Sequence, residues 1–133
     1  MIEMELSKIV INEASEEQII ILKEKQGTRI FPIVIGIYEA AALDRQVRNV
    51  KTARPLTHDL IISILKGLEI SVKRVVINDL QNNTFYARLL VQNNGREVEI
   101  DSRPSDAIVL ASHLNCPIFV EEKILNNLAK EID

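Results

Sequence analysis

Apolar residues alternate with polar ones near the start of the chain and recur at helical spacing further on. The alternation predicts strands over Met1–Ile11, Gln18–Lys25 and Arg29–Ile35. Pro32 has no backbone N–H to donate, so the third strand is expected at a sheet edge or a bulge. From Gly36 the spacing changes and predicts a helix over Ile37–Arg48, with its apolar positions at Ala40, Leu43 and Val47.

The middle of the chain predicts a helix followed by three strands. The helix covers Thr57–Leu68 and is expected to end at Lys66-Gly67. Glu69–Asp79 is a strand whose apolar phase changes, which indicates a bulge near Lys73-Arg74. Asn94-Gly95 is the strongest hairpin signal. It joins two further strands, Thr84–Val91 and Arg96–Asp101, and the second is expected to point Val98 and Ile100 inward.

The last elements complete the fold class. A helix follows Arg103-Pro104, then a short strand over Pro117–Val120 and a helix with an apolar stripe over Ile124–Ile132. Strands, two helices, more strands and then helices do not form an alternating βαβ pattern. The order predicts an α+β fold with a mostly antiparallel or mixed sheet and about four helices, in one compact domain over residues 1–133.

Composition narrows the class of protein. The chain has 133 residues, 47% of them hydrophobic, which is enough for one buried core. No apolar stretch is long enough to span a bilayer, and the first residues do not resemble a signal peptide. Cys116 is the single cysteine, so an internal disulfide and a cysteine zinc cage are excluded. We expect a cytoplasmic protein in which Cys116 is a small buried residue.

The chain is acidic overall but contains one local basic stretch. A formal net charge of −3 argues against a protein that coats nucleic acid. The densest cationic segment contains Arg45, Arg48, Lys51 and Arg54. It is either a local anion-binding patch, or Arg45 and Arg48 simply complement the dipole at the end of a helix.

One phrase occurs twice, each time before an amphipathic run. Arg54-Pro55-Leu56-Thr57-His58-Asp59 and Arg103-Pro104-Ser105-Asp106 both place an arginine, a proline, a hydroxyl and a carboxylate at a predicted helix start. Such a start is either a cap and nothing more, or a site for an anion or phosphate. If an active site exists, we expect the two helix starts to face each other with His58 between them.

The carboxylates and the histidine are candidates for hydrolytic chemistry. His58 could move a proton or could only bond locally at its helix start, and its neighbour Asp59 lies about 100° away around the helix, so adjacency does not make them a pair. Converging carboxylates can hold Mg²⁺ or Mn²⁺ and orient a water. The set to test is Glu39, Asp59, Asp101 and Asp106, although carboxylates in a first helical turn also stabilise the helix.

The two arginines of the phrases have two credible roles. Arg54 and Arg103, with Ser105, could bind phosphate and stabilise the charge that develops on it. Each arginine could instead bridge the acidic residue of the other phrase and tie the two helix starts together.

Several segments together resemble the bifunctional nuclease family of bacteria and plants. They are Phe31–Gly36 with Glu39-Ala40, both Arg-Pro phrases, Phe85-Tyr86-Ala87 and Pro117–Val120, in unbroken order from about residue 3 to residue 130. The resemblance implies hydrolysis of DNA and RNA. It brings no established catalytic set, and the helical Uvr-like segment that plant members often append is not expected here.

Two hypotheses follow. The first is a nuclease without strong sequence preference, in which His58, Asp59, Arg54 and Arg103 act on the phosphodiester, with metal assistance from the carboxylate set. The second is a non-enzymatic oligomeric scaffold or regulator that binds an anion or partner protein, with a subunit contact through edge strands or the helix Ile37–Arg48. A homo-oligomer, with a dimer as the first guess, and no membrane association are expected in either case.

Overall fold

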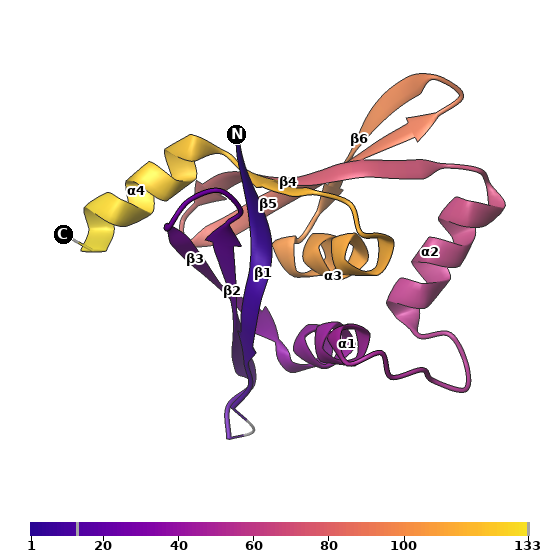
Figure 1. Cartoon of the computed structure of the whole chain (residues 1–133), viewed down its shortest axis with the longest axis horizontal. Coiled ribbons are helices and arrows are strands. Elements are labelled where there is room, and N and C mark those ends of the chain that lie inside the picture. Colours follow the sequence, from indigo (N-terminus) through magenta and orange to yellow (C-terminus); the bar gives the residue numbers. More distant parts are fainter. Residues whose placement is uncertain (13, 133) are drawn as a thin grey trace.

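A curled mixed sheet organises the molecule (Figure 1). The structure, a computed structural model, describes residues 1–12 and 14–132. Within them seven strands form one sheet in the order β3-β2-β1-β7-β4-β5-β6, and every neighbouring pair is antiparallel except β4–β7. The strands are β1 (Ile2–Val10), β2 (Glu17–Glu24), β3 (Ile30–Gly36), β4 (Ser71–Gln81), β5 (Thr84–Asn93), β6 (Arg96–Ser102) and β7 (Ile118–Val120).

The helices confirm the predicted α+β order. They are α1 (Ile37–Val47), α2 (Thr57–Gly67), α3 (Pro104–Leu114) and α4 (Glu122–Ile132). Two irregularities were predicted correctly. β3 is an edge strand with Pro32 opposite Ile21, and the β4–β5 register shifts between Val72 and Arg74, where the bulge was expected.

The helix α3 is the centre of the hydrophobic core. It contacts α1 and α2 as well as strands β3, β4 and β5. Its residues Ala107–Ala111 are all buried, so this helix has almost no polar face. Farther along the sheet, the fully buried ring of Phe31 meets Phe85 edge to face, with ring centroids 5.1 Å apart. The second Arg-Pro phrase therefore starts the most deeply packed helix of the protein.

The helix α2 stands apart from the sheet (Figure 1). Its main contact with the rest of the fold is α3, and Ile62 is its one buried residue. Exposed apolar side chains recur every four residues along α2 and its two flanking positions. Their exposed fractions run from 40% to 63%, at Leu56, Leu60, Ile64 and Leu68. The first Arg-Pro phrase thus starts a helix held against the fold along one narrow face.

One local prediction was wrong. Val98 and Ile100 do not point into the core: they are 36% and 41% exposed, because β6 is an edge strand whose hairpin with β5 extends beyond the helices (Figure 1). The α2 helix ends at Lys66-Gly67, as predicted. Gly67 is the last helical residue, and Glu69, two residues later, takes the left-handed conformation, with φ of 57°.

The helices of the described residues bear on whether the chain could cross a membrane. None of the helices in residues 1–12 and 14–132 combines the length and the apolar character needed to cross a bilayer.

Candidate active site between two helix starts

A histidine and a carboxylate join the first turns of α2 and α3. His58 Nε2 lies 3.0 Å from Asp106 Oδ1, and the two residues are 48 positions apart in the sequence. The partner of His58 is therefore the carboxylate of the other phrase and not the adjacent Asp59. The two helix starts meet with His58 between them, as expected.

Local helix-start chemistry explains why these side chains are available. Asp59 Oδ2 accepts the backbone N–H of Leu56 at 2.9 Å, which closes half of a capping box, since the leucine side chain has no acceptor to return. Pro104 begins α3 and needs no hydrogen-bond partner for its nitrogen. Asp106 holds the same third position in α3 that Asp59 holds in α2, but it bonds across to His58.

The exposure of the pair suits proton transfer at a surface cavity. The His58 side chain is 13% exposed and that of Asp106 is 38% exposed. A carboxylate can only accept, so a neutral His58 must carry its proton on Nε2 and keep its lone pair on Nδ1. Asp106 thus fixes the histidine tautomer while its second oxygen remains free for another partner.

The pair opens into a cavity of about 990 Å³ that we call the His58 cavity. One wall is apolar and comes from α2, α3 and the strands β5 and β6, at Ile61, Leu65, Leu89, Ile100 and Leu110. The ionisable lining comes from the starts of α1, α2 and α3, from the last turn of α1 and from the end of β6, at Glu39, Arg45, His58, Asp101, Arg103 and Asp106. Charged groups at an apolar wall interact more strongly than they do in water.

Arg103 is the cation at the mouth of the His58 cavity. It is the N-cap residue of α3, its side chain is 68% exposed, and its Nη1 lies 3.5 Å from Glu39 Oε1. Glu39 is only 18% exposed. The bridge that forms is therefore from Arg103 to the first turn of α1, and not to Asp59 of the other phrase. A long and exposed ion pair of this kind is weak, so Arg103 can turn to another anion.

A second histidine and carboxylate pair lies farther along the same two helices. Asp59 Oδ1 is 3.8 Å from His113 Nδ1. Burial lowers the pKa of His113 below its ordinary value of 6.5, the nearby His58 lowers it further, and Asp59 acts in the opposite direction. Asp59 does not line the His58 cavity; it lines a neighbouring one with His113.

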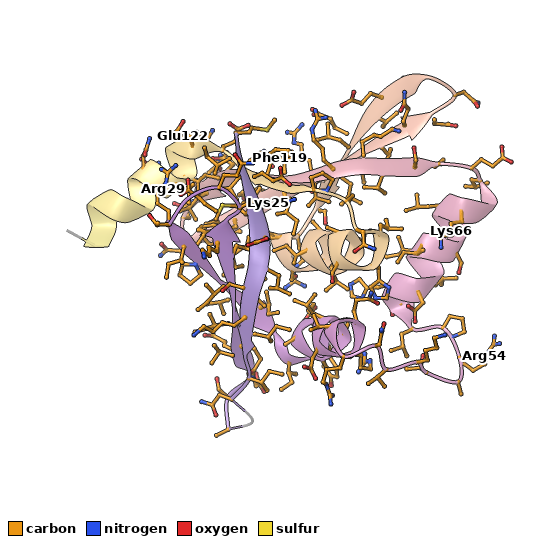
Figure 2. The ribbon with its side chains drawn as sticks, in the orientation of Figure 1. Lys25, Arg29, Arg54, Lys66, Phe119 and Glu122 are labelled. Atoms are coloured by element: carbon orange, nitrogen blue, oxygen red, sulfur yellow. The ribbon has the colours of Figure 1, made fainter. Side chains whose placement is uncertain are left out.

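Two predicted site residues lie away from the His58 cavity. Arg54 is in the exposed loop before α2, and Figure 2 shows its side chain directed outward from the fold. Ser105 is 4% exposed and is not among the cavity-lining residues. Among the ion pairs of the described residues, none joins Arg54 to Asp106 or Arg103 to Asp59, so the predicted bridge from each arginine to the acidic residue of the other phrase does not form.

The candidate carboxylates are divided between different partners. Glu39, Asp101 and Asp106 line the His58 cavity, whereas Asp59 does not. In the part of the chain that the structure describes, no three His, Cys, Asp or Glu side chains gather closely enough to hold a metal ion. The metal hypothesis needs carboxylates that converge on one ion. The structure brings Glu39, Asp101 and Asp106 to one cavity, but it does not cluster them around one point.

Tyr38 was not among the site residues predicted from the sequence. Tyr38 is 85% exposed and lines the His58 cavity, and Arg45, which belongs to the basic stretch, lines it two turns later. Tyr38, Ala41 and Arg45 stand at i, i+3 and i+7, so helical spacing places them on one face with Glu39 beside it. That spacing is the signal that identifies Tyr38.

The fold and the site define a class: a single-core α+β domain with a histidine–carboxylate pair and an exposed arginine in one cavity. Comparison with known proteins gives the family. The profile of the bifunctional nuclease domain matches residues 20–133, and the chain belongs to that family.

Named relatives fall into two groups. An uncharacterised protein of Mycobacterium tuberculosis is 39% identical over 123 residues, which cover 92% of this chain and 73% of the relative. Bifunctional nuclease 1 of Oryza sativa subsp. indica is 26% identical over 88% of this chain, and bifunctional nuclease 1 of Arabidopsis thaliana is 28% identical over 77%. The matched segment makes up 37% and 33% of those two plant proteins.

Proposed function

We propose that this protein hydrolyses phosphodiester bonds of DNA and RNA without strong sequence preference, and that the His58 cavity is its active site. The observation that carries the proposal is the 3.0 Å contact between His58 and Asp106 beside Arg103. Membership of the bifunctional nuclease domain family supports the reaction class. Arg45 and Arg103 in the cavity lining suit contacts to phosphates of the backbone, which carry no sequence information directly.

The His58–Asp106 pair serves the proton transfers. Hydrolysis requires a proton to leave the attacking water and another to reach the departing oxygen. His58, with Nε2 committed to Asp106, takes the proton of the attacking water at Nδ1, and the carboxylate stabilises the imidazolium that forms. The imidazolium then gives a proton from Nδ1 to the departing oxygen, which returns His58 to its neutral form. Positioned acid–base groups contribute roughly 10²–10⁴-fold to such reactions.

Arg103 binds the scissile phosphate and stabilises the charge that develops on it. Its guanidinium is mostly exposed, and its present partner Glu39 is 3.5 Å away. A phosphate in the cavity offers two oxygens to the planar fork, which a single distant carboxylate oxygen does not. Binding therefore exchanges a weak internal ion pair for a stronger one with substrate.

A divalent cation, Mg²⁺ or Mn²⁺, fits the cavity only if substrate phosphate supplies some of its ligands. Mg²⁺ in nucleotide sites commonly uses one or two carboxylates together with substrate phosphate, and Glu39, Asp101 and Asp106 are carboxylates that line the cavity. A bound cation would stabilise charge on the phosphate and favour ionisation of a water. The residues do not fit an all-protein cage, and Asp59 is excluded from the proposed set because it lines another cavity.

The test compares two histidine variants under identical purification. Wild type, His58→Ala and His113→Ala are assayed on plasmid DNA and RNA with Mg²⁺, with Mn²⁺ and with chelator. We expect His58→Ala to lose at least about 100-fold in rate while keeping its circular dichroism spectrum, and His113→Ala to retain activity. Equal cleavage by wild type and His58→Ala would contradict the proposal and point to a contaminating nuclease.

A second candidate function is a non-enzymatic oligomeric scaffold, and one observation favours it. The apolar side chains of Leu60, Ile64 and Leu68 are exposed, as expected for a contact with a second copy of the chain. Light scattering of wild type and Ile64→Lys tests this candidate. An oligomer that the substitution dissociates, combined with a silent nuclease assay, would support it, and a monomer with metal-dependent turnover would contradict it. A homo-oligomer and a cytoplasmic location both remain predictions.

A further inference from the structure

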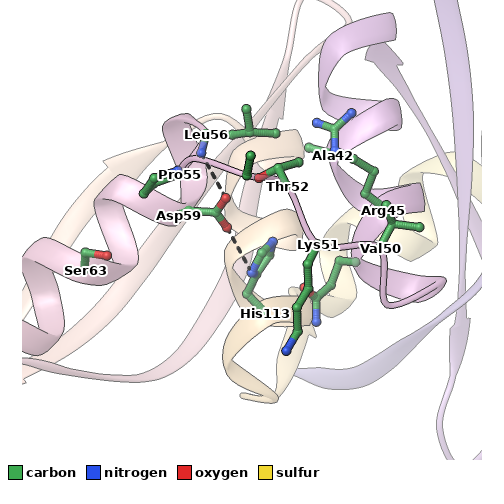
Figure 3. A pocket seen from close by; sticks show the side chains of 12 residues that line it. Ala42, Arg45, Val50, Lys51, Thr52, Pro55, Leu56, Asp59, Ser63 and His113 are labelled. Atoms are coloured by element: carbon green, nitrogen blue, oxygen red, sulfur yellow. Dashed lines mark hydrogen bonds and ion pairs between the residues drawn. The ribbon is translucent and has the colours of Figure 1, made fainter.

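A second cavity lies on the other side of the α2–α3 contact and shares a wall with the His58 cavity. We call it the Lys51 cavity. It measures about 480 Å³ and is lined by α1, the loop before α2, and the helices α2 and α3 (Figure 3). Arg45, Pro55 and Leu56 line both cavities. The two spaces therefore adjoin along the side chain of Arg45 and the Pro55-Leu56 segment.

The charges of the Lys51 cavity favour an anion. Arg45 and Lys51 belong to no ion pair among the residues that the structure describes. The cavity's one carboxylate, Asp59, is already bonded to the Leu56 N–H and faces His113. Two unpaired cations against one engaged carboxylate leave an excess of positive charge in a chain whose net charge is −3.

The positions of the two cations spread that charge along the cavity. Figure 3 shows the Arg45 guanidinium extending toward Leu56, while the Lys51 side chain extends the other way, past His113 in this view. Two neighbouring basic residues are directed elsewhere: Arg48 pairs with Asp44 at 2.9 Å, and Arg54 points outward. The basic stretch of the sequence is thus divided, and only part of it faces the site.

We propose that the Lys51 cavity binds a second phosphate of the same polynucleotide strand that is cut in the His58 cavity, with Arg45 and Lys51 as its cations. Asp106 and His113, which mark the two cavities, are seven residues apart on α3, or about 10 Å along the helix axis. Neighbouring phosphates of one strand are farther apart than their axial rise of about 3.4 Å, because the strand winds around the axis, so about one or two backbone steps connect the two cavities. The inference rests on the proposed function, and it makes the substrate a polymer instead of a single nucleotide.

Binding measurements test this inference separately from cleavage. A labelled single-stranded DNA of about 12 nucleotides, and the RNA of the same sequence, are titrated by fluorescence anisotropy over a range of salt, with chelator present. The proteins are wild type, Arg45→Gln with Lys51→Gln, and Lys51→Glu. Arg48→Gln is the control for the loss of one nearby positive charge, because Arg48 is the C-cap residue of α1 and lines neither cavity.

The expected result is a change in the slope of log affinity against log salt concentration. Each phosphate contact to a single strand contributes about 0.7 to the slope of log affinity against log salt. Because the double variant loses one phosphate contact, it should lower the slope by about 0.7, and Arg48→Gln should leave it unchanged. Lys51→Glu should weaken binding relative to wild type and to Arg48→Gln, because it places a negative charge in the cavity. Circular dichroism confirms that each variant is folded.

Two results would overturn the inference: an unchanged slope in the double variant, or an equal loss in Arg48→Gln. Failure of the proposed function gives a different pattern. In that case His58→Ala and wild type do not differ in cleavage, while the anisotropy slopes still separate the double variant from the control.

Discussion

The contact between His58 and Asp106 predicts a measurable coupling in stability. The perturbation is a double-mutant cycle with His58→Ala, Asp106→Ala and the double variant, each unfolded by urea at about pH 7.5. A hydrogen bond to a charged group contributes about 1.5–3 kcal/mol when buried. Asp106 is 38% exposed, so solvent screening reduces the expected coupling to about 1 kcal/mol.

The second histidine–carboxylate pair is the matched control for that cycle. His113 and Asp59 join the same two helices, but their nearest atoms are 3.8 Å apart, which is too long for a hydrogen bond. The loss of the Asp59 cap cancels in the cycle because it occurs with and without His113. We expect a coupling below about 0.5 kcal/mol for this pair.

The cycle can refute the reasoning directly. A coupling between His58 and Asp106 within about 0.3 kcal/mol of zero would mean that the two helix starts are not joined by this bond. A control coupling as large as the test coupling would mean that the effect belongs to the α2–α3 contact as a whole. Either result would remove the tautomer argument on which the proton-transfer role depends.

Three further predictions concern single residues. Burial lowers the pKa of His113 below 6.5, so as the pH falls through that value the unfolded chain takes up a proton before the folded chain does, and the free energy of unfolding falls. Urea unfolding at about pH 7.5 and about pH 5.5 should therefore show a smaller loss of stability in His113→Gln than in wild type. An equal loss in both proteins would contradict this. Glu69→Gly should raise the free energy of unfolding by about 0.5–1 kcal/mol, because Glu69 has a φ of 57°; a loss of stability would show that its side chain has another role. Burial raises the pKa of the Cys116 thiol, so its reaction with a thiol reagent at about pH 8 should be slow until denaturant is added.

The sequence predicted the fold well where local patterns decide the structure. Strand alternation, the Asn94-Gly95 turn and the proline-led helix starts each determine a backbone conformation within a few residues. Pro32 also identified an edge, because its missing N–H excludes it from the middle of a sheet. Val98 and Ile100 were misplaced because alternation shows that a strand has two faces, but not whether another layer covers one of them.

The sequence predicted which residues belong to the site better than it predicted which of them contact each other. Residue type and helix-start position selected His58, Asp106 and Arg103. Contacts across 48 residues of sequence depend on how α2 is placed against α3, which no local pattern specifies. For that reason the carboxylate partner of His58, the pairing of Arg103 with Glu39 and the outward direction of Arg54 became visible only in the folded chain.

One measurement tests the central claim most directly: the rate at which Asp106→Asn cleaves labelled DNA and RNA oligonucleotides compared with wild type. The substitution keeps the size of the side chain and one hydrogen-bond acceptor but removes the charge that stabilises protonated His58. The account predicts a loss of at least about 100-fold on both substrates, in a protein that is folded. Cleavage at the wild-type rate would show that the His58–Asp106 pair is not the proton-transfer group.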